Sequence, residues 1–219
     1  MSFDLERLSY AAAAVNRSTM FVNVPMMLTF AFLADPIIAI LFGEAWLESV
    51  PVLQVLCIAA VLWPVQIVNI NALLASGHSR LLLYLEIPKK VLGIVLLLVG
   101  INFGLIGVAW SQAVFALFAF FLNAYFTGVH IGYGLRAQIT DLVPIIVLAS
   151  VTQFLVGVSF AYLELSDISR LLLAPAVFFV VYVLFSHIFR LKAWSEFVIR
   201  VSAAIHAAHS RASQSTAGL

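Results

Sequence analysis

Long apolar runs separated by short polar breaks constrain this chain more than any other feature of its sequence. An α-helix needs about 20 apolar residues to cross a hydrocarbon core of about 30 Å. Of the 219 residues, 64% are hydrophobic and 10% are charged, and a water-soluble domain of this size cannot cover so much apolar surface. The runs are continuous rather than alternating, which argues against the strands of a membrane barrel. The sequence therefore predicts an all-α integral membrane protein.

Six of these runs are long enough to be transmembrane helices. They cover residues 18–42, 49–75, 80–101, 103–126, 142–163 and 170–189. The first run is interrupted at Asp35-Pro36. Together the six runs define one predicted membrane unit, residues 1–189.

Residues 190–219 have a different pattern. In "RLKAWSEFVIRVSAAIHAAHSR", apolar residues recur at helical spacing, and Lys192, Glu196 and Arg200 occupy other positions. This spacing predicts a cytoplasmic amphipathic helix that lies on the membrane surface. The final residues, "ASQSTAGL", are expected to be disordered.

The distribution of basic residues predicts the direction of the spans. Cytoplasmic loops of membrane proteins carry an excess of Lys and Arg. With the N-terminus in the cytoplasm, every Lys and Arg except Arg170 falls on the inner side, whereas the outer loops carry acidic residues such as Glu44 and Glu164. We therefore expect both termini in the cytoplasm.

The third run, "LLLYLEIPKKVLGIVLLLVGI", contains the charged residues Glu86, Lys89 and Lys90. A helix limited to residues 91–101 would reach only about 16 Å, half of the hydrocarbon core. The helix must therefore begin near Ser79, and the two lysines lie roughly 12–15 Å along it.

Two interpretations of these charges stay open. Long lysine side chains can reach back to the headgroups, which makes them a membrane-edge anchor. Alternatively, Glu86 pairs with a lysine at i+3 or i+4, one positive charge is left over, and Pro88 bends the helix. In that case the group lines a water-filled cavity suited to phosphate.

Other polar residues inside the runs support a cavity more weakly. Gln66 and Asn69 lie on one face of the second run, and Gln112 lies in the fourth. Hydrogen bonding between helices is the alternative explanation for all three. Kinks are predicted at Pro25, Pro64 and Pro88, where neighbouring groups or cavity water must satisfy the freed carbonyls.

The sequence carries no signature of catalysis. HExxH, GxSxG, P-loop and GxGxxG motifs are absent, and the five histidines fall in loops or at helix ends. Cys57 is the single cysteine, which excludes disulfides and cysteine metal clusters within one chain. No basic stripe fits nucleic acid. We expect no catalytic residues, no metal, no cofactor, no nucleic-acid partner and no enzymatic activity.

Three motifs together resemble a known family. They are "LFGxxW" from Leu41 to Trp46, "NxNALLASGHS" and "LExxKK", all within residues 40–135, and a looser likeness continues through "GYGLRAQITDLVP". This part of the chain resembles the C-terminal half of bacterial oligosaccharide flippases of lipopolysaccharide and exopolysaccharide biosynthesis. These flippases belong to the multidrug/oligosaccharidyl-lipid/polysaccharide exporter superfamily.

The resemblance implies a protein of the bacterial inner membrane that moves undecaprenyl-diphosphate-linked sugars between the leaflets. Members of the superfamily have two lobes around a cationic cavity, and six spans are equivalent to one lobe. The implied partners are the lipid-linked oligosaccharide, membrane lipids, and either a missing N-terminal lobe or a second copy. In such a site Lys89 and Lys90 attract the diphosphate and Glu86 holds them, and Gln66, Asn69 and Gln112 contact sugar hydroxyls.

Other functions remain open. One is another exporter of the same superfamily, for peptidoglycan precursors or drugs, and another is a non-transporting membrane scaffold. Ion-coupled exporters need an acid deep in a lobe, and here Glu86 lies close to two lysines. A polymerase or ligase would need a large outer loop rich in Arg and His, whereas the predicted outer loops are short and acidic.

Overall fold

Helices make up all of the regular secondary structure in the part of the chain that the computed structural model describes, residues 2–163 and 166–203. The helices are α1 (Ser2–Phe32), α2 (Ala34–Phe42), η1 (Glu44–Ser49), α3 (Val50–Val61), α4 (Trp63–Ala75), α5 (Ser79–Ile101), α6 (Gly104–Ile131), α7 (Leu135–Ala161) and α8 (Asp167–Ile188). Residues 192–203 are also helical. The predicted disordered tail lies outside the described residues.

Four segments have the length and hydropathy of a membrane span. They are Glu44–Ala75, Gly104–Ile131, Leu135–Ala161 and Ile168–Ile188. A fifth span results if α1 and α2, which are bent by 65° relative to each other, are taken together. The all-helical membrane class is confirmed, whereas the number of six spans remains a prediction.

Helix α5 is the predicted span that this count leaves out, because Glu86, Lys89 and Lys90 fall in every 18-residue stretch of it. It nevertheless starts at Ser79, as the sequence predicts, and continues for 23 residues. At 1.5 Å per residue it is about 34 Å long, enough to cross a hydrocarbon core.

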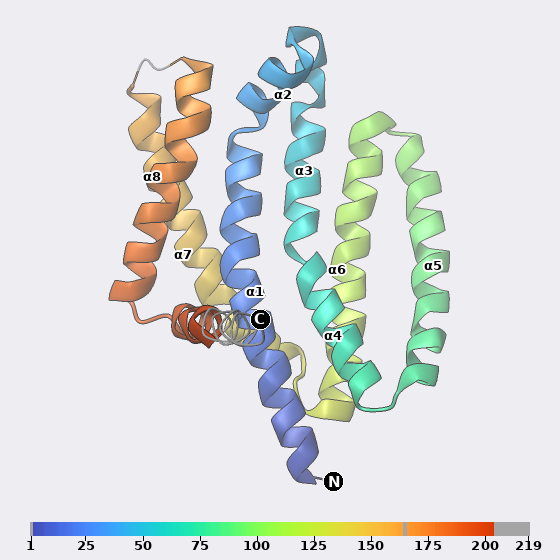
Figure 1. The fold of residues 1–219 in the computed structure, drawn as a ribbon. Coiled ribbons are helices and arrows are strands. Elements are labelled where there is room, and N and C mark those ends of the chain that lie inside the picture. The colour runs from blue at the N-terminus through green and yellow to red at the C-terminus, as the bar shows by residue number, and fades with distance from the viewer. Residues whose placement is uncertain (1, 164–165, 204–219) are drawn as a thin grey trace, which may run out of the picture.

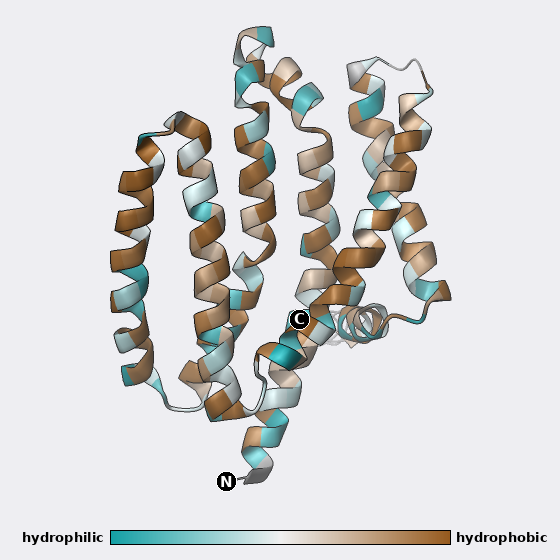
Figure 2. Ribbon diagram, turned by 180° about the vertical axis from the view of Figure 1, so that it is seen from behind, coloured by the Kyte–Doolittle hydropathy of each residue, from teal (hydrophilic) through white to brown (hydrophobic). Residues whose placement is uncertain are grey.

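The helices are arranged around α1, which runs through the middle of the molecule (Figure 1). Helices α7 and α8 lie on one side of it, and α3, α4, α6 and α5 follow on the other, with α5 at the edge. The main core includes Met20, Phe21, Val24, Val65, Ile145, Phe178 and Tyr182. Apolar residues also cover much of the outward surface of the helices (Figure 2), as contact with lipid requires.

Close backbone contact joins α5 to α6. A Cβ added to Gly100 would lie 2.7 Å from the carbonyl oxygen of Gly107, so neither position has room for a larger residue. Small residues at such crossings let membrane helices approach each other closely.

The second predicted span is broken at Leu62, just before Pro64. Proline has no N–H, so the carbonyl four residues earlier, that of Ala60, loses its helical partner. The side-chain amide of Asn23 in α1 donates to the carbonyls of Ala60 at 3.4 Å and Val61 at 3.1 Å. A neighbouring helix thus satisfies the backbone at this break, as a bilayer demands.

At two places along the first predicted span, a side chain from another helix likewise donates to a backbone carbonyl. Pro25 frees the carbonyl of Phe21, and the hydroxyl of Tyr182 in α8 donates to that carbonyl at 3.2 Å, while α1 continues without a break. The amide of Gln54 in α3 donates at 3.3 Å to the carbonyl of Ala31, just before the bend between α1 and α2.

The interruption predicted at Asp35-Pro36 falls slightly earlier, at Leu33. Pro36 cannot bond to the carbonyl of Phe32, so the first helix ends at that residue.

Residues 192–203 lie across the bundle, close to the middle of α1 (Figure 1). Leu191, Trp194 and Phe197 pack against the main core, with the rings of Trp194 and Phe197 centred 5.6 and 5.4 Å from that of Phe21. Part of the apolar pattern predicted to face lipid therefore faces α1. Val198, Ile199 and Val201 remain exposed.

Replacing Asn23 tests whether the amide of α1 stabilises the break. Asn23→Leu removes the donor and leaves two carbonyls without it, so we expect unfolding to become easier by about 1–2 kcal/mol. The measurement is thermal unfolding of the purified protein in detergent. Asn71→Leu is the matched control, because Asn71 is exposed on α4 and makes no hydrogen bond among the described residues. Equal unfolding midpoints for the two variants would contradict this role of Asn23.

Candidate functional site

A groove of about 360 Å³ lies between α3, α4 and α6. Its size falls within the range of about 300–1,000 Å³ that is typical of ligand sites. The residues that line it are Leu56, Ala59, Ala60, Trp63, Gln66, Gln112, Phe115 and Ala116. Two predicted candidates, Gln66 and Gln112, therefore face one space although they belong to different spans.

The break at Leu62 determines what the groove presents. It places Trp63 at the start of α4, where the side chain is 67% exposed. Gln66 donates to the carbonyl of Ala116 at 3.3 Å, and Gln112 makes no hydrogen bond within the described part of the chain. Carboxamides can both donate to and accept from hydroxyls, and an indole offers a large flat apolar face. The groove therefore presents two carboxamides between mainly apolar walls.

Asn69 does not line this groove. It is buried between α4 and α7, where it exchanges two hydrogen bonds of 3.0 and 2.8 Å with Gln138. Gln138 also donates to the carbonyl of Tyr133 at 2.9 Å. The structure thus gives Asn69 the role of an interhelical contact.

The two lysines of α5 occupy different environments. Lys89 is only 3% exposed and lies against α6. Its ammonium donates to Glu86 on the same helix and, at 3.3 Å, to the amide oxygen of Asn123 on α6. Lys90 is exposed and forms no ion pair with any described residue. Neither lysine lines the groove. Because Glu86 neutralises Lys89, the positive charge left over belongs to Lys90.

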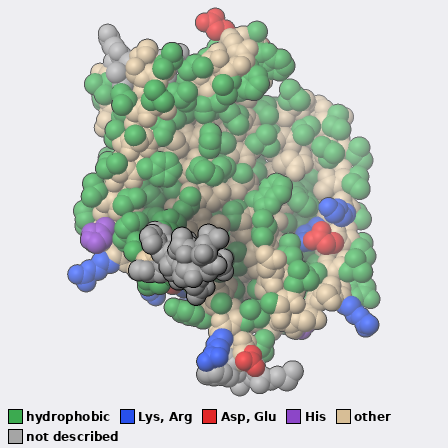
Figure 3. Space-filling view, in the orientation of Figure 1, with side chains coloured by type: hydrophobic (Ala, Val, Ile, Leu, Met, Phe, Trp, Pro, Cys, Tyr) green, Lys and Arg blue, Asp and Glu red, His purple; other side chains and the backbone are tan. Residues whose placement is uncertain are grey.

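The charges of α5 form a small group in a mainly apolar face, at the edge where Figure 1 places this helix (Figure 3). Both ribbon views show residues 192–203 level with the half of α5 that contains its start, below the midpoint of that helix (Figures 1 and 2). Pro88 is exposed, and α5 continues through it without a break.

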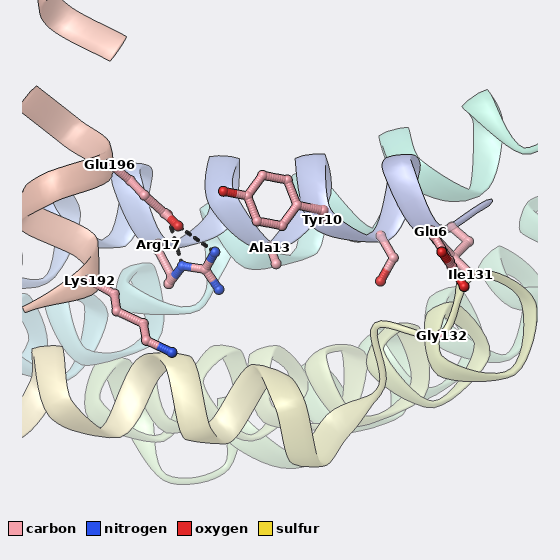
Figure 4. A pocket seen from close by; sticks show the side chains of 9 residues that line it. Glu6, Tyr10, Ala13, Arg17, Ile131, Gly132, Lys192 and Glu196 are labelled. Atoms are coloured by element: carbon pink, nitrogen blue, oxygen red, sulfur yellow. Dashed lines mark hydrogen bonds and ion pairs between the residues drawn. The ribbon is translucent and has the colours of Figure 1, made fainter. Parts of the chain in front are cut away.

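A network around Arg17 was not predicted. The guanidinium donates to both carboxylate oxygens of Glu196, at 2.8 and 2.6 Å (Figure 4). It also donates to Asp141 at 2.9 Å. The three side chains are only 12–16% exposed. Paired geometry of this kind gives the strongest hydrogen bonds between charged groups. Arg17 therefore fastens helix 192–203 and α7 to α1.

Tyr133 extends this network into the link between α6 and α7. Its hydroxyl donates to Asp141 at 2.9 Å and accepts from Asn16 at 3.0 Å. Burial raises the pKa of the Tyr133 hydroxyl above its usual range, with a further contribution from the Asp141 carboxylate. The hydroxyl therefore stays protonated and able to donate.

Two cavities of about 660 and 630 Å³ flank Arg17. The first is lined by Glu6 and Glu196 as well as by Arg17 and Lys192, so its charges balance (Figure 4). The guanidinium of Arg17 already binds the carboxylates of Asp141 and Glu196. We therefore assign this network a structural role, and the groove beside Trp63 is the candidate site.

Comparison with known proteins gives two matches. The family profile described as "Polysaccharide biosynthesis protein" matches residues 1–51, which comprise α1, α2 and η1. The Teichuronic acid biosynthesis protein TuaB of Bacillus subtilis (strain 168) is 28% identical over 158 residues. The chain is therefore similar to proteins of polysaccharide biosynthesis. This confirms the resemblance found in the sequence as far as polysaccharide biosynthesis.

The match with TuaB covers 71% of this chain and 33% of TuaB, so the chain spans about a third of the length of this curated relative. No solved structure matches the chain.

Chemical modification tests whether Lys89 and Lys90 of this chain lie in different environments. In a Cys57→Ala background, Lys90→Cys should react with a water-soluble maleimide at least about tenfold faster than Lys89→Cys, because access limits thiol reactivity. The rates are measured on the folded protein in detergent, and both variants must elute as the parent does in size-exclusion chromatography. Equal rates would show that Lys89 is not buried against α6.

Proposed function

We propose that this chain forms one lobe of a flippase in the bacterial inner membrane. Its substrate is an undecaprenyl-diphosphate-linked oligosaccharide of lipopolysaccharide or exopolysaccharide biosynthesis, which moves from the cytoplasmic to the periplasmic leaflet. The groove lined by Trp63, Gln66 and Gln112 is the observation that carries the proposal, and the similarity to polysaccharide biosynthesis proteins supports it. In this role the protein is a transporter and not an enzyme.

The chemistry of the groove fits the sugar part of such a substrate. A passing sugar must exchange hydrogen bonds with water for hydrogen bonds with protein, or the transfer costs several kcal/mol per unpaired group. Gln66 and Gln112 supply neutral partners that accept or donate in any orientation of a hydroxyl. Their lack of charge suits repeated binding and release.

The breaks in the helices fit a moving lobe. Discontinuous helices and rocking of one lobe against another are general features of secondary transporters. Here the break at Leu62 adjoins the groove, and the bend at Leu33 lies towards the predicted outer side. The second lobe is supplied by another polypeptide segment or by a second copy of the chain, and both termini are cytoplasmic.

The charged residues of α5 act at the entrance in this proposal. Lys90, exposed at the middle of α5, attracts the diphosphate, while Glu86 and Asn123 hold Lys89 against α6. Asn69 contributes by joining α4 to α7 rather than by contacting sugar.

Replacing the two groove amides tests the proposal. In a bacterium that depends on the complete protein, the double variant Gln66→Leu, Gln112→Leu should reduce surface polysaccharide at least about tenfold, because the site loses its partners for hydroxyls. Lipid-linked oligosaccharide should accumulate in the cytoplasmic leaflet. Surface polysaccharide is measured by immunoblot, and the leaflet by accessibility of the sugar to a membrane-impermeant lectin in inverted vesicles.

Asn71→Leu on the exposed side of α4 is again the control, and it should leave polysaccharide at the wild-type level. Normal polysaccharide in the double variant, at normal protein abundance, would overturn the proposal and favour a non-transporting scaffold. A shortage of lipid-linked oligosaccharide instead of an accumulation would place the defect before translocation.

A further inference from the structure

A second groove lies on the other side of the break at Leu62, between α1 and helix 192–203. Its volume is about 490 Å³. It is lined mainly by apolar side chains from three helices, among them Val22, Met26, Pro64, Phe197 and Val201. Several of these side chains are more than a third exposed, although ordered helices surround them on both sides.

The groove has one charged end. Among the described residues that line the groove, Arg200 is the single charged one. Arg200 forms no ion pair with any described residue of the chain. A guanidinium is well suited to a phosphate group because it offers several N–H donors in one plane. The groove thus combines one cation with hydrocarbon walls.

We propose that this groove binds an anionic phospholipid of the surrounding membrane, with the phosphate at Arg200 and one acyl chain along Val22 and Met26. An acyl chain removes the apolar walls from water, and the phosphate balances the charge of Arg200. The inference does not rest on translocation of a sugar. It assigns helix 192–203 a function beyond lying on the membrane, because this helix supplies both Phe197 and Arg200.

The position of helix 192–203 is fixed by contacts that the lipid does not provide. Glu196 is bound by Arg17, and Trp194 and Phe197 pack against Phe21. The groove is therefore preformed, and little conformational entropy is lost when a lipid enters.

Native mass spectrometry of the purified full chain in detergent tests the proposal, with phosphatidylglycerol and phosphatidylcholine as probes. The wild-type protein should retain phosphatidylglycerol in preference to phosphatidylcholine. Arg200→Gln should lower the affinity for phosphatidylglycerol about fivefold and that for phosphatidylcholine much less, because the choline ammonium already offsets the charge of its phosphate. Lys192→Gln is the matched control, because Lys192 is an exposed cation on the same helix that lines a different cavity.

A larger side chain in the groove tests separately whether the acyl chain binds there. Val22→Trp should weaken binding of both lipids, and Met26→Trp serves if the first variant does not elute as a folded protein. Inorganic phosphate should not displace the lipid, because most of the proposed contact is with hydrocarbon.

Three results would overturn the inference. Equal losses in Arg200→Gln and Lys192→Gln would indicate diffuse attraction to a basic surface. Unchanged lipid binding in a folded groove-filling variant would show that no chain lies there. Displacement by inorganic phosphate would indicate an anion site without a lipid.

Discussion

The structure depends on a constraint that water does not impose. In hydrocarbon, every backbone N–H and C=O must find a partner inside the protein. This chain places prolines inside its spans, and each proline frees a carbonyl. At the break before Pro64 and at Pro25, a side chain from another helix supplies the missing donor, Asn23 in one case and Tyr182 in the other. The bent shapes of the helices are therefore fixed by tertiary contacts.

Helix α1 makes most of these connections. It supplies Asn23 to the break in the second span, Phe21 to the aromatic cluster, and Arg17 to the ion pairs that hold α7 and helix 192–203. The groove proposed for sugar opens where α4 begins after the break, so its geometry depends indirectly on α1. A change in the bend could alter the groove without any change in the residues that line it.

The sequence predicted features that depend on neighbouring residues. The start of α5 at Ser79 followed from the length a span requires, and the pairing of Glu86 with Lys89 followed from helical spacing. Adjacent residues point about 100° apart on a helix, which is why Lys89 faces α6 while Lys90 is exposed. Which lysine is buried depends on where α6 packs, and the sequence pattern does not contain that information.

Contacts distant in sequence were beyond prediction for the same reason. Arg17 and Glu196 are 179 residues apart. The sequence predicted only that Arg17 lies on the cytoplasmic side and that Glu196 lies on the polar face of an amphipathic helix. Trp63 gave no signal as a site residue, because an aromatic side chain in an apolar run is indistinguishable from one that faces lipid. Gln66, Asn69 and Gln112 stood out as polar residues, but only the packing separated the groove pair from the interhelical contact.

In the proposed mechanism the groove between α3, α4 and α6 receives the sugar of a lipid-linked oligosaccharide. Site-specific photo-crosslinking in membranes that contain radiolabelled substrate tests it most directly, with the probe at Phe115 in the groove or at Leu117 on the exposed side of α6. We expect labelled sugar on the protein with the probe at Phe115 and background labelling with the probe at Leu117. Equal labelling at the two positions, or labelling confined to Leu117, would contradict it.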